Sequence, residues 1–219
     1  MNDKHALVLG ATGATGQEIV KLLLDDSNYN KVTIFVRREV DIRHKKLKIH
    51  VIDFSKLYEY KDLVKGDILF SALGTTLKDA GSKDKQFLVD YTFQYEFAKM
   101  ASDNGVKIYS LVSSLGANKN SLFYYPKIKG KLEEDVKLLN FKSIQIFQPP
   151  SLIRQSELMR PGERISIKLF QKLNGIGFLK SFKPMSVVVL ASKMLSESYE
   201  TQNDIVTTYK PADIFDYQR

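Results

Sequence analysis

The sequence contains no cysteine among its 219 residues, which excludes disulfide bonds and thiolate chemistry. Its three histidines, His5, His44 and His50, do not have the spacing of metal ligands, so we expect no metal site. No stretch approaches the roughly 20 apolar residues that a membrane helix needs, and the first residues lack the pattern of a signal peptide. We therefore expect a cytoplasmic protein that holds no metal and does not cross a membrane.

Proline is scarce in the first two thirds of the chain, where only Pro126 precedes residue 149. The other prolines follow at Pro149, Pro150, Pro161, Pro184 and Pro211. We expect the last third to be more irregular and to cover the carboxyl edge of a sheet, where ligands of open α/β sheets bind. A chain that is 43% hydrophobic and 26% charged fits a single domain over residues 1–219.

Short apolar runs alternate with segments of helical periodicity along the chain. The expected strands are rich in Val, Ile and Leu, as strands buried on both faces are: Ala6–Gly10, Val32–Val36, Lys48–Ile52, Asp67–Ala72, Ile108–Val112 and Ser143–Phe147. The expected helices are Gly16–Leu24, Lys85–Asn104, which ends at Gly105, and Lys127–Leu139. This alternation predicts an α/β fold with a doubly wound parallel sheet and helices on both faces.

A glycine-rich segment, "LGATGATG", joins the first expected strand to the first expected helix. Its glycines, Gly10, Gly13 and Gly16, have the spacing GxxGxxG and not the GxGxxG of the standard Rossmann fingerprint. The physical roles are similar: a tight turn, close approach of a phosphate to the backbone, and close helix packing. We predict a Rossmann-like site in which these glycines, with Thr12, Ala14 and Thr15, bind a dinucleotide at the helix N-terminus. A tight turn without a ligand is the alternative.

Two arginines follow the second expected strand, where an NAD-binding protein would carry an acidic residue for the ribose 2′-hydroxyl. Guanidinium groups at Arg37 and Arg38 would instead bind a 2′-phosphate, which favours NADP(H) over NAD(H). They begin a basic run, Arg37–Lys48, in a chain of formal net charge +8. The alternative interpretation of that basic run is a solvated face of the protein. No nucleic-acid motif accompanies it, so nucleic-acid binding is not favoured.

Two further strand ends carry candidate cofactor contacts. Asp53 could accept a hydrogen bond from the adenine amino group and Phe54 could line the adenine edge, although structural roles are equally open for both. In "SALGTT", Leu73 and Gly74 follow the fourth strand, where small residues would let a ribose lie against the backbone. A plain turn is the alternative there.

The segment "SSLGANKNSLFYYPKIKGKLEE" could carry chemistry. Tyr125 and Lys129 are four residues apart on one face of an expected helix, and Ser113 or Ser114 ends the preceding strand. A nearby ammonium group would lower the pKa of a phenol, which could then exchange a proton with a carbonyl oxygen that a serine hydroxyl positions. YxxxK also arises by chance, but its place after a fifth strand and a glycine loop favours the catalytic interpretation.

These motifs together resemble an atypical, single-domain short-chain dehydrogenase/reductase, in particular the Tat-interacting-protein type of oxidoreductase and its bacterial relatives. The matching segments are "LGATGATG", "FVRR", "ALGTT", "AGSKDKQFLVDY", "VSSLGANKNSLFYYPKIKGKLEE", "PSLIRQSELMRPGER" and "MSVVVLASKML", in that order. The resemblance implies that the glycine loop, Arg37 and Arg38 bind NADP(H). It also implies that Tyr125 is the proton donor or acceptor and that Lys129 holds the nicotinamide ribose.

The same resemblance adds Leu152 and Arg160 as further cofactor contacts. Two positions depart from the family pattern: Pro149–Pro150 replaces the usual Pro-Gly after the sixth strand, and Asp90 stands in the expected place of a helical asparagine that serves a proton relay. Residues 1–148 are then the nucleotide-binding core and residues 149–219 the substrate side of one NAD(P)-binding domain.

The leading hypothesis is an NADP(H)-dependent oxidoreductase that acts on a small carbonyl compound or alcohol. NAD(H) is possible as the cofactor. The alternative hypothesis is an NADP(H)-binding regulatory protein with little or no turnover, which would act through a protein partner. The sequence does not decide whether the protein forms a homodimer, and it does not identify the substrate.

Overall fold

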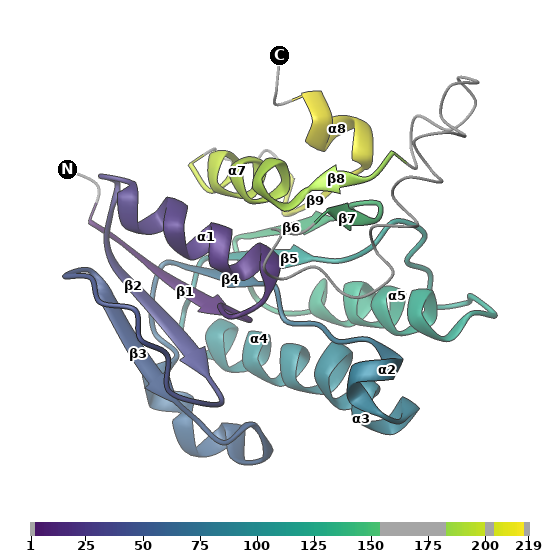
Figure 1. Ribbon diagram of the computed structural model, residues 1–219, viewed down its shortest axis with the longest axis horizontal. Coiled ribbons are helices and arrows are strands. Elements are labelled where there is room, and N and C mark those ends of the chain that lie inside the picture. Colours follow the sequence, from purple (N-terminus) through teal and green to yellow (C-terminus); the bar gives the residue numbers. More distant parts are fainter. Residues whose placement is uncertain (1–2, 154–182, 200–203, 217–219) are drawn as a thin grey trace.

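The structure is a computed structural model that describes residues 3–153, 183–199 and 204–216. Figure 1 shows a twisted central sheet with helices on both sides. Its seven strands lie in the order β3-β2-β1-β4-β5-β6-β9, and every neighbouring pair is parallel. They are β1 (Lys4–Leu9), β2 (Tyr29–Val36), β3 (Leu47–Val51), β4 (Ile68–Ser71), β5 (Ile108–Val112), β6 (Ser143–Phe147) and β9 (Val206–Tyr209). The predicted doubly wound parallel sheet is confirmed.

Two layers of helices cover the sheet (Figure 1). One face carries α1 (Ala14–Asp25), α7 (Val187–Glu197) and α8 (Pro211–Phe215). The other face carries the 3-10 segment η1 (Phe54–Leu63), α4 (Phe93–Asp103) and α5 (Tyr124–Val136). The short helices α2 (Leu77–Ala80) and α3 (Lys83–Phe87) lead into a π-helical turn, η2 (Leu88–Thr92), and a two-stranded sheet pairs β7 (Leu152–Ile153) with β8 (Met185–Ser186).

The strands alternate their side chains between two apolar cores because successive residues of a strand point to opposite faces. On β1, Ala6 and Val8 pack toward α1 and α7, whereas Leu7 and Leu9 pack toward α4. All residues of β4 and β6 are buried. The continuous apolar runs in the sequence therefore arise from burial on both faces.

The strand predictions were right for six of the seven strands of the central sheet. The bounds of β5 and β6 are as predicted, and those of β1 to β4 differ by no more than three residues. Strand β9 was not predicted, because its short sequence "VTTY" has little of the apolar character of the other strands. It pairs with β6 and forms the edge of the sheet.

Two predicted helices differ from the structure in a way that matters for function. The predicted helix Lys85–Asn104 is interrupted by the π-helical turn η2, which carries Asp90 into the interior. Helix α5 begins at Tyr124 instead of Lys127, so Tyr125 lies in its first turn. Gly105 ends α4 with φ near 80°, as its sequence predicted.

Candidate cofactor and active site

A cavity of about 620 Å3 lies at the carboxyl edge of the sheet. We call it the edge cavity. It brings together nine of the predicted site residues: Gly13, Ala14, Thr15, Leu73, Gly74, Ser113, Tyr125, Lys129 and Leu152. Strands β1 and β4 are neighbours in the sheet and mark the point where the strand order reverses, which is where open α/β sheets bind ligands.

The first and third glycines of the loop are required by close packing within the protein. Gly10 has φ of 85°, and a Cβ there would lie 2.5 Å from the backbone nitrogen of Leu73. A Cβ on Gly16 would lie 2.1 Å from the carbonyl oxygen of Gly10. Because neither residue has a side chain, the end of β1, the end of β4 and the start of α1 can contact one another. Neither glycine is among the residues that line the edge cavity.

The second glycine is different. A Cβ on Gly13 would come no closer than 3.4 Å to its nearest neighbour, the carbonyl oxygen of Gly10, which is an ordinary contact. Gly13 is also the N-cap of α1 and supplies no side-chain cap, so backbone N–H groups are presented at the cavity wall. A helix N-terminus of this kind attracts phosphate groups. Thr15 is buried beside it, whereas Thr12 is exposed and is not among the lining residues.

Arg37 and Arg38 are exposed and directly follow β2. Strand β2 pairs with β1, and Phe35 lies opposite Leu9, so the two arginines and the glycine loop leave adjacent strands at the same edge. They lie outside the lining of the edge cavity.

Asp53 and Phe54 have structural roles in this fold. Asp53 caps η1, accepting hydrogen bonds from the backbone N–H of Ser55 at 2.9 Å and from its hydroxyl at 2.7 Å, and these bonds lower the pKa of Asp53. Phe54 is buried, with its ring centre 5.5 Å from that of Phe93. Neither lines the edge cavity, and their predicted adenine contacts stay predictions.

The two candidate serines have different surroundings. Ser113 is buried at the end of β5, lines the edge cavity and donates its hydroxyl hydrogen to Oε1 of Glu133. Ser114 does not line the cavity, and its hydroxyl donates to the carbonyl oxygen of Leu115 at 3.3 Å. Between the alternatives, the geometry favours Ser113.

Tyr125 and Lys129 both face the edge cavity from α5. Tyr125 is 39% exposed, whereas Lys129 is only 2% exposed. The Lys129 ammonium group donates to the carbonyl oxygen of Val112 at 2.9 Å. Burial lowers the pKa of Lys129, against the opposing charges of Asp90 and Glu133.

The adjacent Tyr124 also lines the cavity, but its hydroxyl donates to the carbonyl oxygen of Lys83 at 2.5 Å. Gly130, which was not among the predicted site residues, lets α5 approach the preceding loop. A Cβ there would lie 2.3 Å from the backbone of Asn118 and Lys119. This close contact fixes the helix that carries Lys129.

Asp90 is a buried carboxylate at the rear of the site. Its Oδ1 accepts from the backbone N–H of Thr75 at 3.1 Å and lies 3.2 Å from where a Cβ on Gly74 would be. Its Oδ2 has no hydrogen-bond partner within the described residues. Burial raises the pKa of Asp90, while the charge of Lys129 opposes that shift.

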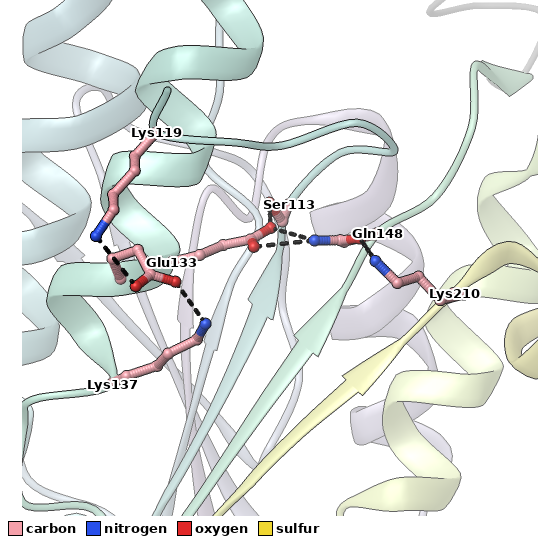
Figure 2. Close-up of polar contacts among 7 residues, drawn as sticks. Ser113, Lys119, Glu133, Lys137, Gln148 and Lys210 are labelled. Atoms are coloured by element: carbon pink, nitrogen blue, oxygen red, sulfur yellow. Dashed lines mark hydrogen bonds and ion pairs between the residues drawn. The ribbon is translucent and has the colours of Figure 1, made fainter. Parts of the chain in front are cut away.

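A polar cluster behind Ser113 was not predicted from the sequence. Figure 2 shows Ser113, Glu133, Gln148 and Lys210 joined by hydrogen bonds in one row. The one available signal was the spacing of Lys129 and Glu133, which are four residues apart and share a helix face. Gln148 and Lys210 follow separate strands, so their proximity depends on the sheet order.

Leu152 lines the edge cavity from β7, and its predicted contact with the cofactor stays a prediction. Arg160 lies outside the described residues. In the part of the chain that the structure describes, no cluster of three or more potential metal ligands is found. No helix within those same ranges has the length and apolar character to span a membrane.

Residues 10–138 match the NAD(P)H-binding family. The chain is 36% identical over 177 residues to Protein HTATIP2 of Rattus norvegicus, covering 79% of this chain and 73% of that protein. It is also 32% identical over 216 residues to Protein FMP52-1, mitochondrial, of Scheffersomyces stipitis, covering 94% and 95% of the two chains. The chain belongs to this NAD(P)H-binding family. The predicted kinship with the Tat-interacting-protein type is thereby confirmed.

Solved structures show the same fold. MoeE5 in complex with UDP-glucuronic acid and NAD has a TM-score of 0.70 at 15% identity, with 94% of this chain and 76% of that chain covered. A short-chain dehydrogenase/reductase superfamily protein from Agrobacterium tumefaciens with bound NAD has a TM-score of 0.66 at 13% identity, with 94% and 77% covered. These similarities show that the chain shares its fold with both structures.

The edge cavity of this family member fits a dinucleotide in its own geometry. Among the described residues, no atom would lie closer than 3.4 Å to a Cβ on Gly13, and Gly13 itself supplies no side-chain cap to α1. A volume of about 620 Å3 is within the usual range of cofactor sites.

Proposed function

We propose that this protein is an NADP(H)-dependent oxidoreductase that reduces a small carbonyl compound or oxidises the corresponding alcohol. The observation that carries the proposal is the composition of the edge cavity. Residues 13–15 of the glycine loop and Leu73–Gly74 form one part of its wall, and Ser113, Tyr125 and Lys129 form another. A nicotinamide held between these walls would supply or accept the hydride.

Tyr125 is the proposed proton donor in the direction of reduction. As the hydride reaches the carbonyl carbon, the phenol gives its proton to the carbonyl oxygen, and the reverse transfer accompanies oxidation. Lys129 has the proposed role of holding the nicotinamide ribose and stabilising the phenolate. Its contact with the Val112 carbonyl and its burial support this role because they restrict the ammonium group to one position.

Replacing Tyr125 by phenylalanine tests the mechanism. We expect Tyr125→Phe to lower kcat by about 100-fold or more, the usual range for loss of a general acid, while the Kd of NADPH changes by less than a few-fold. The matched control is Tyr124→Phe, since Tyr124 lines the same cavity but donates to the Lys83 carbonyl. Turnover by Tyr125→Phe equal to that of the parent protein would refute the proposed role.

The preference for NADP(H) is proposed from Arg37 and Arg38. Each guanidinium lost from a 2′-phosphate should cost about 1.5–3 kcal/mol, or roughly 10- to 150-fold in NADPH affinity, with little change for NADH. Arg43→Ala is the control, because Arg43 is also exposed and pairs with Asp41 at 3.3 Å. Equal losses for NADPH and NADH in Arg37→Ala and Arg38→Ala would contradict the preference.

The alternative function is an NADP(H)-binding regulatory protein that acts through a protein partner. One observation favours it: the Ser113 hydroxyl, which would position a carbonyl oxygen, already donates to Glu133. A broad panel of carbonyl compounds that gives no NADPH oxidation, in a protein that binds NADPH tightly, would select this alternative over the oxidoreductase.

A further inference from the structure

Three strands place a polar residue at the same level of the carboxyl edge. Ser113 follows β5, Gln148 follows β6 and Lys210 follows β9, and these strands end in register. Their side chains therefore form a row across the sheet, and the carboxylate of Glu133 from α5 joins it beside Ser113 and Gln148 (Figure 2). Ser113, Glu133 and Gln148 are each less than 10% exposed.

The direction of each hydrogen bond in this row follows from Lys210. An ammonium group has hydrogens to donate and no lone pair to accept. Since Lys210 Nζ lies 2.5 Å from Oε1 of Gln148, that atom must be the amide oxygen. The amide nitrogen of Gln148 is thereby turned toward Glu133, and it donates to both carboxylate oxygens at 2.9 Å.

Glu133 therefore receives hydrogen bonds on both oxygens, and its Oε1 also accepts from Ser113. A serine hydroxyl has one hydrogen and two lone pairs. Because the hydrogen of Ser113 is directed at Glu133, only lone pairs remain for a ligand in the edge cavity. This polarity is the reverse of what a bare carbonyl oxygen needs.

We propose that Glu133 is a positioning residue that fixes Ser113 as a hydrogen-bond acceptor toward the edge cavity, so that the substrate carries a hydroxyl group beside its reacting carbon. The substrate class is then an α-hydroxycarbonyl compound or the corresponding vicinal diol. Tyr125 serves the reacting oxygen, and Ser113 accepts from the neighbouring hydroxyl. The statement about substrates rests on the proposed oxidoreductase function, whereas the polarity of Ser113 does not.

The next residue along α5 provides a matched control. Glu134 points away from this row and pairs with Lys137 at 2.7 Å and Lys119 at 3.6 Å. Figure 2 shows those two lysines on the far side of the helix from Gln148. Glu134→Gln removes the same charge from the same helix without touching the row, so it reports the effect of charge alone.

Glu133→Gln should reverse the polarity. The oxygen of the new amide at position 133 must face Gln148 in order to accept from the amide nitrogen of that residue. The nitrogen of the new amide then faces Ser113, and the serine oxygen must accept a hydrogen bond from that nitrogen. The hydroxyl hydrogen of Ser113 is released toward the cavity. Thermal melting of both variants checks that the fold is retained.

The first measurement requires no turnover. In proton NMR with selectively labelled serine, the Ser113 hydroxyl hydrogen should exchange slowly with water because it is buried and bonded to a carboxylate. We expect this resonance in the parent protein and in Glu134→Gln, and its loss in Ser113→Ala and Glu133→Gln. A resonance that persists unchanged in Glu133→Gln, or that is absent from the folded parent protein, would overturn the proposed polarity.

The second measurement compares matched ketones with and without an α-hydroxyl group, starting with hydroxyacetone and acetone and NADPH as reductant. For pairs that are turned over, we expect kcat/KM to favour the hydroxylated member by about tenfold, the effect of one hydrogen bond. Ser113→Ala and Glu133→Gln should lose that preference and Glu134→Gln should keep it. A parent protein without the preference overturns the substrate class. A protein that reduces no ketone contradicts the proposed function, and the NMR result then decides the Ser113 polarity by itself.

Discussion

Replacing Gly13 by alanine should separate cofactor binding from folding. Gly13 has φ of −81° and ψ of 166°, which alanine adopts without strain. In the part of the chain that the structure describes, the added methyl group would meet no atom closer than 3.4 Å. Alanine is a poorer N-cap than glycine, which lowers the stability of the folded protein. Alanine also restricts the unfolded chain, which raises the stability by a similar amount. We therefore expect the free energy of unfolding to change by less than about 1 kcal/mol.

The effect on the cofactor should be much larger. The methyl group would occupy the space at the start of α1 that we assign to the pyrophosphate, and a crowded rigid contact typically costs about 1–3 kcal/mol. That cost corresponds to a loss of roughly 5- to 150-fold in affinity. The Kd of NADPH, measured by titration of its fluorescence, gives this number, and urea unfolding gives the stability.

The matched control is Gly16→Ala in the same loop. Its methyl group would lie 2.1 Å from the carbonyl oxygen of Gly10, so the backbone must move. Alanine in a helix normally gains about 1 kcal/mol over glycine, but here we expect a net loss of stability of about 1–3 kcal/mol. Gly13→Ala that binds NADPH like the parent protein, or that unfolds as easily as Gly16→Ala, would refute this division of roles.

Two further predictions concern stability. Gly130→Ala should lower the free energy of unfolding by about 1–3 kcal/mol, because its Cβ would lie 2.3 Å from the backbone of Asn118; a urea midpoint that stays the same or rises would contradict this. Burial, with a smaller contribution from the charge of Lys31, lowers the pKa of His5 from 6.5 to about 4. The unfolded chain therefore binds a proton in that interval that the folded protein does not, and stability falls as pH falls from 6.5 to 4. After a discount for partial exposure we expect about 1–2 kcal/mol, which His5→Gln should abolish and His44→Gln should not.

Much of the fold could be predicted because its strands are apolar on both faces. The runs that became β5 and β6 are bounded by polar residues, Lys107 and Ser113 for the first and Lys142 and Gln148 for the second, and their bounds were right. Strand β9 was missed because four residues with two threonines give little periodic signal. The π-helical turn was missed because Phe87, Tyr91 and Tyr95 keep a regular helical stripe through it, with stacked rings at 4.7 and 5.9 Å.

The site could be predicted where its residues are close in sequence to a strand end or a glycine loop. Tyr125 and Lys129 share a helix turn, and Gly13 marks the loop. The choice between Ser113 and Ser114 could not be made, since it depends on which residue the strand directs at Glu133. Lys210 could not be found at all, because its partner Gln148 is 62 residues away and the two meet only through β9.

The strand order also has a consequence for how the chain can assemble during synthesis. Strand β1 lies inside the sheet, with β2 and β3 added outward on one side and β4, β5, β6 and β9 on the other. Each new strand therefore emerges from the ribosome after the strand that it pairs with, and it extends an edge that already exists. A nascent chain that folds from its N-terminal end can therefore add each strand to one that is already in place, and once β3 has paired, every later strand extends the side of the sheet that begins at β1.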